Sequence, residues 1–458
     1  MNDKTPNLSL VVLAAGQGTR MRSGLPKVLH EVGGASLVAH AIRSANDLSP
    51  ERVVVVTGHG AKAVNAHLEG LFPNAQTVEQ SERLGTAHAV DQAREALADF
   101  DGDVIVLYGD TPFIEGSTLE RMLAARQTGA DVVVLGFEAA EPGKYGRLIV
   151  ENDKLERIVE AKDASPQELA VTLCNSGVVC ADSKELFKLI SQVNNDNASG
   201  EYYLTDIVGL ANAAGKNCIA VTCHEAETMG INSRVELSLA EAVFQAKARK
   251  TAMLNGATLQ APDTVYFSYD TQLGQDVVVE PNVVFGPGVS VADNANIRAF
   301  SHFEDCMIGA GAVVGPYARI RPGSEIGQGA KIGNFVETKK AKVGTGAKIN
   351  HLSYVGDAEV GDEANIGAGT VTCNYDGVLK HQTKIGAKAF IGTNSSLVAP
   401  VEVGDGAMTA AGSVITRNVP ADALAVSRAP QITKEGFVPK LLSRLRAIKA
   451  KRDAKKNS

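Results

Sequence analysis

A glycine-rich turn followed by two cations lies near the start of the chain. Gly16 and Gly18 come after a run of apolar residues, and Arg20 and Lys27 follow closely. The backbone N–H groups of such a turn can approach phosphates, and the two cations can hold a triphosphate. Asp110 ends a later apolar run, where a carboxylate is a natural ligand for magnesium shared with phosphate oxygens. A glycine turn alone is weak evidence, but the combination predicts nucleotidyl transfer.

The elements that would position these residues alternate between strand and helix. Apolar runs at 8–14, 52–57 and 103–108 are typical of buried strands, and the stretch 87–100 is helix-like. Such alternation predicts an α/β fold with a parallel sheet, whose ligands lie beyond the carboxyl ends of the strands. The first half is therefore expected to be a Rossmann-like domain.

In the second half an aliphatic residue returns at every sixth position, usually followed by glycine. The step is unbroken from Ile308 to Ile332 and resumes from Ile385 to Val403. A six-residue period predicts a parallel β-helix, in which three hexads close one coil and the aliphatic residues form a continuous column. The polar segment 372–381 interrupts the repeat, and insertions in repeat proteins gather on the binding face. This loop is expected to be functional.

Length and composition limit the alternatives. The 458 residues suggest two or three domains, and the net charge of −7 argues against a general nucleic-acid binder. The six cysteines form no CxxC pair, which fits free thiols in a reducing compartment. Neither a signal peptide nor a run of membrane-spanning length is visible. We expect a cytoplasmic protein that binds neither nucleic acid nor membrane.

The joint between the halves is predicted to be one helix. Ser233 and Glu236 have the spacing of a capping box, and apolar residues such as Val235, Leu239 and Met253 follow at helical spacing. The last segment, 438–458, is basic and is expected to be a solvated or frayed terminus.

The stretch from Leu13 to Met21, with Pro26 and Lys27, resembles the signature of sugar-1-phosphate nucleotidyltransferases. Joined to hexapeptide repeats that carry Asn374-Tyr375-Asp376-Gly377, it resembles the family of bifunctional bacterial N-acetylglucosamine-1-phosphate uridyltransferases and glucosamine-1-phosphate acetyltransferases. The resemblance extends from Leu10 to about Phe437. It implies a uridylyltransferase domain at 1–232, a linker helix at 233–256, a left-handed parallel β-helix with acetyltransferase activity at 257–437, and a homotrimer.

The resemblance also implies the residues of the first site. UTP and N-acetylglucosamine-1-phosphate would react with Mg²⁺ held by Asp110 and Asn232, while Arg20 and Lys27 neutralise phosphates. Gln17 stands where a basic residue is usual, so one phosphate contact is in doubt. The remaining implied residues are Leu13, Ala14, Ala15, Gly16, Gln80, Gly85 and Thr86 around the uridine, Tyr108 and Gly109 beside the metal, and Gly146, Glu160 and Asn175 around the sugar.

For the second site the resemblance implies acetyl transfer from acetyl-CoA to glucosamine-1-phosphate, with His351 as general base. A histidine with a pKa near its ordinary value of about 6.5 suits that role, because a sugar amine must lose a proton before it attacks a thioester. Arg321, Lys339, Tyr354, Asn365, Asn374 and Tyr375 would bind the sugar phosphate, and Ala368, Thr393, Ala411 and Arg428 would bind acetyl-CoA. Thr393 stands where serine is frequent, a change expected to be tolerated.

Three other hypotheses remain. The protein could be a nucleotidyltransferase for another sugar, such as the ADP-glucose type, with a regulatory β-helix, or its repeats could be a structural trimerisation scaffold. The joint presence of Lys339, His351 and the Asn374 loop counts against the former. A metal site built from His302, His351 and His381, as in carbonic anhydrases with a β-helix, lacks a convincing shared spacing.

Overall fold

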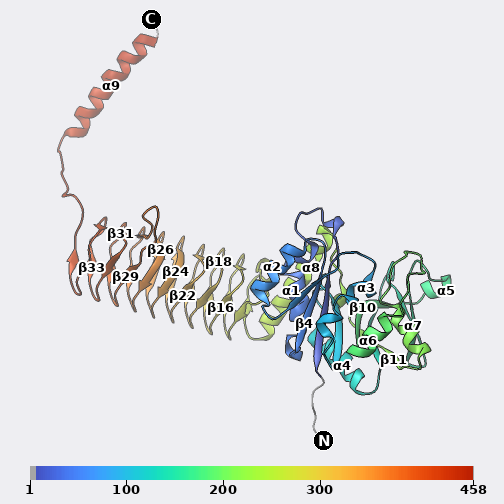
Figure 1. Ribbon diagram of the computed structural model, residues 1–458. Coiled ribbons are helices and arrows are strands. Elements are labelled where there is room, and N and C mark those ends of the chain that lie inside the picture. Colours follow the sequence, from blue (N-terminus) through green and yellow to red (C-terminus); the bar gives the residue numbers. More distant parts are fainter. Residues whose placement is uncertain (1–6, 457–458) are drawn as a thin grey trace. The chain divides into compact units, whose positions relative to one another are not determined.

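The computed structural model describes residues 7–456, which fall into two compact units. The first runs to Thr251 and also contains Tyr266–Thr271, and the second comprises Ala252–Val265 and the chain from Gln272 onward. Figure 1 shows a sheet with helices in the first unit and stacked coils of short strands in the second. The predictions of an α/β domain and a parallel β-helix are confirmed.

The first unit is built on a nine-stranded sheet in which the order of the main path is β11-β7-β10-β6-β1-β4-β5. The pairs β1–β4, β1–β6, β4–β5 and β7–β11 are parallel, while β10 runs antiparallel to both β6 and β7. The strands are β1 (Leu8–Ala14), β4 (Arg52–Thr57), β5 (Gln76–Glu79), β6 (Asp103–Tyr108), β7 (Val132–Glu138), β8 (Arg147–Glu151), β9 (Lys154–Val159), β10 (Leu173–Asp182) and β11 (Cys218–Cys223), with β2 (Glu31–Val32) and β3 (Ala35–Ser36) in a separate hairpin.

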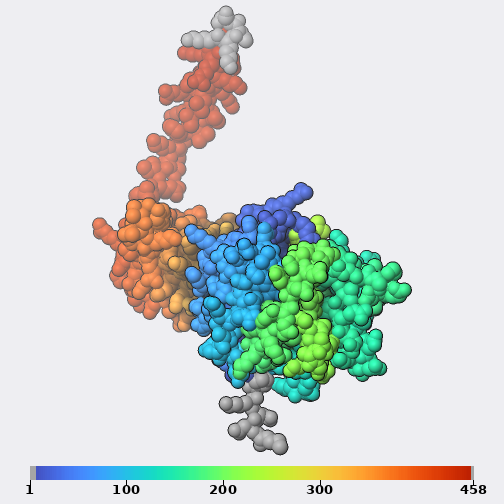
Figure 2. Space-filling model, turned by 45° about the vertical axis from the view of Figure 1, so that its right-hand side comes forward, coloured from blue at the N-terminus to red at the C-terminus, as the bar shows by residue number. Residues whose placement is uncertain are grey.

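Helices cover both faces of this sheet because its buried strands are apolar on both sides. Val11 points into one core layer and its neighbours Leu10 and Val12 into the other. The first layer contains α3, α6 and α7, and the second contains α1, α2 and α4. Figure 2 shows the packed surface of this unit, coloured from blue to yellow-green. The helices are α1 (Leu37–Arg43), α2 (Ala61–Leu71), α3 (Thr86–Asp91), α4 (Gly116–Gln127), α5 (Pro166–Leu169), α6 (Ser183–Ile190), α7 (Asp206–Ala213) and α8 (Arg234–Leu254), with 3₁₀ turns η1 (Thr19–Met21), η2 (Lys27–Leu29), η3 (Asn46–Leu48), η4 (Glu95–Leu97) and η5 (Glu225–Thr228).

The helix predicted as a linker is α8, and its buried face differs from the predicted stripe. Val235 and Leu239 are 72% and 56% exposed, whereas Ala240 and Gln245 are buried. The Gln245 amide exchanges two hydrogen bonds with the backbone of Phe267, which explains why Tyr266–Thr271 belongs to the first unit. The Ser233 hydroxyl accepts the Glu236 N–H at 3.3 Å, but the Glu236 carboxylate accepts from Asn232, so the predicted capping box forms only in part.

The second unit is a left-handed parallel β-helix with three faces, defined by three ladders of parallel strands. The first face contains β12 (Thr258–Leu259), β14 (Val278–Val279), β17 (Asn296–Ile297), β20 (Val313–Val314), β23 (Lys331–Asn334), β25 (Lys348–His351), β27 (Asn365–Ile366), β30 (Phe390–Ile391), β33 (Met408–Thr409) and β35 (Leu424–Ala425). The second contains β15 (Val284–Phe285), β18 (His302–Phe303), β21 (Arg319–Ile320), the first parts of β24 (Glu337–Val343) and β26 (Tyr354–Val360), then β28 (Val371–Cys373), β31 (Ser396–Val398) and β34 (Val414–Ile415). The third contains β13 (Gln272–Leu273), β16 (Val289–Val291), β19 (Cys306–Ile308), β22 (Ser324–Ile326), the last parts of β24 and β26, then β29 (Thr383–Ile385) and β32 (Val401–Val403).

The six-residue column forms the core of this unit. Ile308, Ile320 and Ile332 are at most 2% exposed, as the repeat predicts. The segment between β28 and β29 leaves the coil as a loop, so the predicted insertion is confirmed.

The C-terminal segment is helical over α9 (Phe437–Lys456), which corrects the expectation of a frayed terminus. Its apolar side chains Leu441, Leu445 and Ile448 are nevertheless exposed, so the segment is solvated as expected. Throughout residues 7–456, the helices are too short or too polar to cross a membrane.

Candidate active sites

The predicted nucleotide residues follow the carboxyl ends of parallel strands. Ala15 and Gly16 come directly after β1, Gln80 after β5, and Asp110 shortly after β6. Parallel strands bring these ends to one edge of the sheet. The Gly109 N–H donates to the Leu13 carbonyl at 2.9 Å, which joins the ends of β1 and β6 directly.

Lys27, Asp110 and Asn232 form a compact cluster at this edge. The Lys27 ammonium is hydrogen-bonded to Oδ2 of Asp110 and lies 3.0 Å from Oδ1 of Asn232. Lys27 is buried at the start of η2, and the Ile231 N–H donates to the Asp110 carbonyl at 3.0 Å, which brings Asn232 to the site. Two oxygens thus converge on one cation.

The same two oxygens fit a hard divalent cation, because such ions prefer oxygen ligands and can take some of them from a bound substrate. Within residues 7–456 no group of three or more His, Cys, Asp or Glu side chains is arranged to hold a metal. An ion between Asp110 and Asn232 would therefore depend on substrate oxygens for its other ligands.

Tyr108 connects the cluster to the predicted sugar residues. Burial raises the pKa of its phenol, and the carboxylates of Asp110 and Glu160 raise it further, while a hydrogen bond with Thr86 opposes the shift. A Cβ placed on Gly146 would lie 3.5 Å from the Glu160 carboxylate and 3.6 Å from Asn175. Gly146, Glu160 and Asn175 therefore lie together, and Tyr108 is near enough to feel the charges of both Asp110 and Glu160.

Gln80 and Gly85 are held together beside α3. The Gln80 amide nitrogen donates to the Gly85 carbonyl at 3.2 Å and lies 3.0 Å from Nδ1 of His88, which leaves its oxygen as an acceptor. Gly85 has φ of +118°, and a Cβ there would come within 2.4 Å of the Tyr202 carbonyl. Only glycine fits this position without moving the backbone.

A cation from another loop contacts the glycine turn, and the sequence analysis missed it. Arg20, in η1, is exposed, and Gln17 accepts a hydrogen bond of 2.8 Å from the Arg83 guanidinium. Arg83 lies on the loop between β5 and α3. Its positive charge therefore lies beside Gln17, the position where a basic residue is usual.

In the β-helix, the predicted base and the predicted acetyl-CoA residues lie in one column. The column runs along the corner between the first and second faces, one residue from each successive coil. The carbonyls of His351, Ala368 and Thr393 accept N–H groups of the next coil at 3.3, 2.7 and 2.7 Å, and the Ala411 carbonyl accepts from Arg428 at 2.7 Å. The sequence-predicted set is thus brought together.

His351 has a defined tautomer in this column. Its Nδ1 lies 2.9 Å from Oδ1 of Asn334, an acceptor, so Nδ1 carries the proton and Nε2 keeps a free lone pair. The side chain is exposed, and its backbone carbonyl accepts from the Ser353 hydroxyl at 2.8 Å. This arrangement suits a general base.

Cations gather on the second face beside the column. Arg321 is paired with Glu337 at 2.7 Å, and the ammonium of Lys380, from the inserted loop, lies close enough to that of Lys339 to lower the pKa of Lys339. Two ammonium groups that face each other favour an anion between them. Lys380 was not among the predicted residues.

The inserted loop is fastened to the same face. The Asn374 amide donates to the carboxylate of Asp357 and lies 3.5 Å from the Tyr354 hydroxyl. Tyr375 is 59% exposed, and its hydroxyl donates to the Gly377 carbonyl. Asn365 is the exception among the predicted residues, since it lies on β27 of the first face.

The histidine metal hypothesis gains no support, because each histidine has a different partner. His302 lies 3.4 Å from Glu304 and His381 lies 2.7 Å from Asp376, while His351 contacts Asn334.

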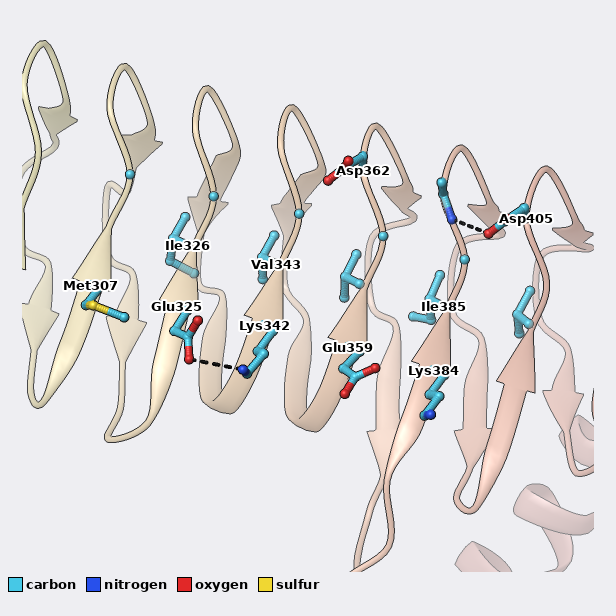
Figure 3. Close-up of a pocket in the computed structure, with 18 of the residues that line it drawn as sticks. Met307, Glu325, Ile326, Lys342, Val343, Glu359, Asp362, Lys384, Ile385 and Asp405 are labelled. Carbon is cyan, nitrogen blue, oxygen red and sulfur yellow. Dashed lines mark hydrogen bonds and ion pairs between the residues drawn. The ribbon is translucent and has the colours of Figure 1, made fainter.

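A groove of about 1380 Å³ lies elsewhere, along the third face (Figure 3). Its charges alternate in register through Glu325, Lys342, Glu359 and Lys384, and Lys342 is 3.4 Å from Glu325. The glycines beside the inward residues form its floor, and a Cβ on Gly327 would come within 2.6 Å of the backbone of the next coil. Coil stacking therefore explains the groove without a ligand.

Three residues that sequence reasoning missed have structural signals. Asn334 is identified by its contact with His351, Lys380 by its contact with Lys339, and Arg83 by its contact with Gln17. Only the departure at Gln17 gave a hint in the sequence.

Comparisons with known families match both units. A family model described as a MobA-like NTP transferase domain matches residues 10–201. A model described as bacterial transferase hexapeptide (six repeats) matches residues 305–340 and 382–417.

Curated relatives match nearly the whole chain. The bifunctional protein GlmU of Jannaschia sp. (strain CCS1) is 59% identical over 442 residues, covering 96% of this chain and 97% of the relative. Those of Ruegeria sp. (strain TM1040) and Paramagnetospirillum magneticum (strain AMB-1) are 58% and 56% identical, covering 96% and 97% of this chain and 98% and 99% of the relatives. The similarity extends through both units.

Proposed function

This chain belongs to the family of bifunctional GlmU proteins and is a bifunctional enzyme of UDP-N-acetylglucosamine synthesis, and we propose how its residues perform the two reactions. Acetyl transfer from acetyl-CoA to glucosamine-1-phosphate comes first. Uridylyl transfer from UTP to N-acetylglucosamine-1-phosphate follows and releases pyrophosphate. The observation that carries the assignment is the 58–59% sequence identity with bifunctional relatives over 96% of this chain. The chain also contains two separate polar sites, one for each reaction.

Uridylyl transfer takes place at the edge of the sheet. The phosphate oxygen of the sugar attacks the α-phosphorus of UTP in line, so no protein nucleophile is required and catalysis rests on positioning and charge neutralisation. Lys27 and Arg20 neutralise phosphates, and the free oxygen of Gln80 accepts the N–H of uracil. Glu160, Asn175 and Gly146 hold the sugar.

A divalent cation fits this site, and we assign it as Mg²⁺. Asp110 and Asn232 would hold it, and it would neutralise negative charge on the phosphate oxygens. Lys27 is bonded to the same two oxygens, so its ammonium is placed to contact phosphate groups bound beside them.

Acetyl transfer takes place along the column that contains His351. Nε2 of His351 takes a proton from the amine of glucosamine-1-phosphate as the nitrogen attacks the thioester carbon. The C–S bond of the tetrahedral intermediate then breaks, and the coenzyme A thiolate takes a proton from the imidazolium. Asn334 holds the tautomer, Arg321, Lys339 and Lys380 bind the phosphate, and Ala368, Thr393, Ala411 and Arg428 line the path of acetyl-CoA.

The enzyme is a homotrimer in this proposal, because hexapeptide β-helices commonly trimerise and the column is open to solvent in one chain. A cytoplasmic location fits the six cysteines, all of which are free.

Two assays test the proposed function. Thiol release from acetyl-CoA should require glucosamine-1-phosphate, and pyrophosphate release from UTP should require N-acetylglucosamine-1-phosphate and Mg²⁺. Pyrophosphate formation without any thiol release would favour the alternative, a nucleotidyltransferase with a structural β-helix.

A further inference from the structure

Gln80 is a buried amide at the end of β5, and the proposed recognition of uracil depends on which of its polar atoms faces the base. Its backbone N–H donates to the Thr57 carbonyl at 2.8 Å, so the residue is anchored to the sheet. A half-turn about the last side-chain bond exchanges the amide oxygen and the NH₂ group, which reverses what the residue offers to a ligand. The orientation of this amide is therefore a question of specificity.

The Gly85 carbonyl and the His88 ring together determine that orientation. The side-chain nitrogen of Gln80 lies 3.2 Å from the Gly85 carbonyl oxygen and 3.0 Å from Nδ1 of His88. A carbonyl oxygen only accepts, so the group that faces Gly85 must be NH₂. The same NH₂ group reaches Nδ1 of His88, which therefore accepts its second N–H.

This contact also defines the tautomer of His88. Nδ1 accepts, so the ring proton is on Nε2. The opposite tautomer would let Nε2 accept from the Gln92 amide at 3.3 Å, but it would place a ring N–H against the NH₂ group of Gln80 at the shorter distance of 3.0 Å. The Gln92 amide already has an acceptor in the His88 carbonyl at 3.0 Å.

The helix that carries His88 is itself fixed to a distant segment. α3 begins directly after Gly85, and the Thr86 hydroxyl accepts the Leu204 N–H at 3.0 Å. The Ala87 N–H donates to the Tyr202 carbonyl at 2.9 Å. The half-buried His88 ring is thus held in place by its helix and does not depend on a bound nucleotide for its position.

Uracil and cytosine differ in what they present to such an amide. Uracil has an N–H at ring position N3, which donates to an amide oxygen, whereas cytosine has a lone pair there, which would face that oxygen without a hydrogen bond. The rotated amide would offer its NH₂ group to N3 and favour cytosine. A site built to pair with one polar group rejects an analogue that leaves its own polar atoms unpaired.

We propose that His88 is a positioning residue that selects uridine over cytidine nucleotides, because it accepts a hydrogen bond from Gln80 and so keeps the Gln80 oxygen turned towards the base. The proposal deepens the proposed function and rests on it for the place of the base at Gln80. His88 acts through Gln80 and need not touch the nucleotide.

Two substitutions of His88 in the full chain separate the hydrogen bond from the packing of the ring. His88→Leu keeps an apolar side chain of moderate size and removes the acceptor, whereas His88→Asn supplies an amide oxygen that can lie near the place of Nδ1. Initial rates of pyrophosphate release with N-acetylglucosamine-1-phosphate and Mg²⁺ are measured with UTP and with CTP. Calorimetric titration with each nucleotide gives the same comparison without turnover.

His88→Leu should lower kcat/KM for UTP by about three- to tenfold, the factor that one neutral hydrogen bond contributes. The value for CTP should stay constant or rise, so the ratio of UTP to CTP falls, and His88→Asn should restore most of that ratio. His67→Leu is the matched control, because His67 is also half-buried but lies on α2 in the other core layer and contacts Ser36 at 2.8 Å. Its ratio should equal that of the wild type.

The direction of the change decides between a role in specificity and a role in folding. An equal loss with UTP and CTP in His88→Leu would mean that the ring only supports the helix, and this result or an unchanged ratio would overturn the proposal. A ratio in His88→Asn as low as that in His88→Leu would overturn the hydrogen-bond explanation. Wild-type protein that binds UTP but releases no pyrophosphate would refute the proposed function, and the binding ratios would still test His88.

Discussion

Lys27, Asp110 and Asn232 meet at one point although they come from three distant parts of the chain. Asp110→Ala removes the carboxylate that both holds Lys27 and offers an oxygen to a metal. Uridylyl transfer should fall by about 10²–10³-fold, since such electrostatic contacts contribute that much to stabilising charge in the transition state. Acetyl transfer, which uses the other unit, is the internal control and should remain nearly intact. Uridylyl activity above a few per cent of wild type would show that the metal assignment is wrong.

Arg83 gives a prediction that depends on its contact with Gln17. If Arg83 supplies the charge that Gln17 lacks, Arg83→Gln should lower kcat/KM for UTP by about tenfold, less than the loss of a buried contact because water and salt screen an exposed cation. Adding Gln17→Lys should restore most of the rate. If Arg83 only held Gln17 in place by a hydrogen bond, a cation at position 17 would not restore the rate. Steady-state kinetics of the double variant therefore distinguish a charge role from a structural role.

His351→Ala should lower the rate of acetyl transfer by about 10²–10⁴-fold, the usual loss for a positioned base, and leave uridylyl transfer unchanged. Asn334→Ala should cost less and should also change the pH dependence of kcat/KM, because either ring nitrogen could then carry the proton. Stopped thiol-release assays between pH 6 and 9 measure both effects. Acetyl transfer within a few-fold of wild type in His351→Ala would exclude this histidine as the base.

At the scale of elements, the inserted loop is closed by a carboxylate. Asp376 contacts His381 at 2.7 Å and accepts the N–H groups of Leu379 and Val378 at 2.7 and 2.8 Å, which together lower its pKa to about 2. Because the folded pKa lies below the ordinary value of 3.8, the contribution of Asp376 is present above about pH 4 and is lost as the pH falls towards 2. Asp376→Asn should mimic that loss at neutral pH.

The expected result for Asp376→Asn is a several-fold rise in KM for glucosamine-1-phosphate with a smaller change in kcat, since the loop presents Asn374 and Lys380 to the substrate. Hydrogen exchange at Val378 and Leu379 should become faster in the variant. The amides of the neighbouring strand β28 serve as the reference and should be unaffected. If hydrogen exchange became faster while KM stayed unchanged, the order of the loop would not affect substrate binding, and the prediction would be refuted.

Helices and strands could be predicted from the sequence where buried apolar residues recur at a regular spacing. The hexad positions are buried because each coil must place one aliphatic residue inside, so the repeat in the sequence is the core itself. The α8 stripe was misread because Val235 and Leu239 are apolar but exposed, while the polar Gln245 is buried by its two bonds to Phe267. A periodic pattern of apolar residues reveals only positions that are buried because they are apolar. Gln245 is polar and is buried because it forms hydrogen bonds with Phe267, so the pattern does not reveal it.

Some site residues could likewise be predicted from the sequence and others could not. Gly16, Asp110 and His351 could be proposed because strand ends, glycine turns and the family signature mark them in the sequence. Lys380 and Arg83 could not, because their signal is a contact with another side chain that no local pattern encodes. Such partners become visible only when the fold brings distant segments together.

For the whole molecule, the two activities should respond differently to dilution. The side chains assigned to uridylyl transfer all belong to the first unit, whereas the acetyl-transfer column is exposed along a corner of the second unit and needs a neighbouring chain in the proposed trimer. Specific acetyl-transfer activity should therefore fall as the protein is diluted below the dissociation constant of the assembly, and uridylyl activity should stay constant. Both rates are measured on the same dilution series, with the assembly state followed by sedimentation. Because mass action acts on association alone, a parallel fall of both activities would indicate unfolding or adsorption, and constant acetyl transfer in a demonstrated monomer would mean that one chain holds a complete site.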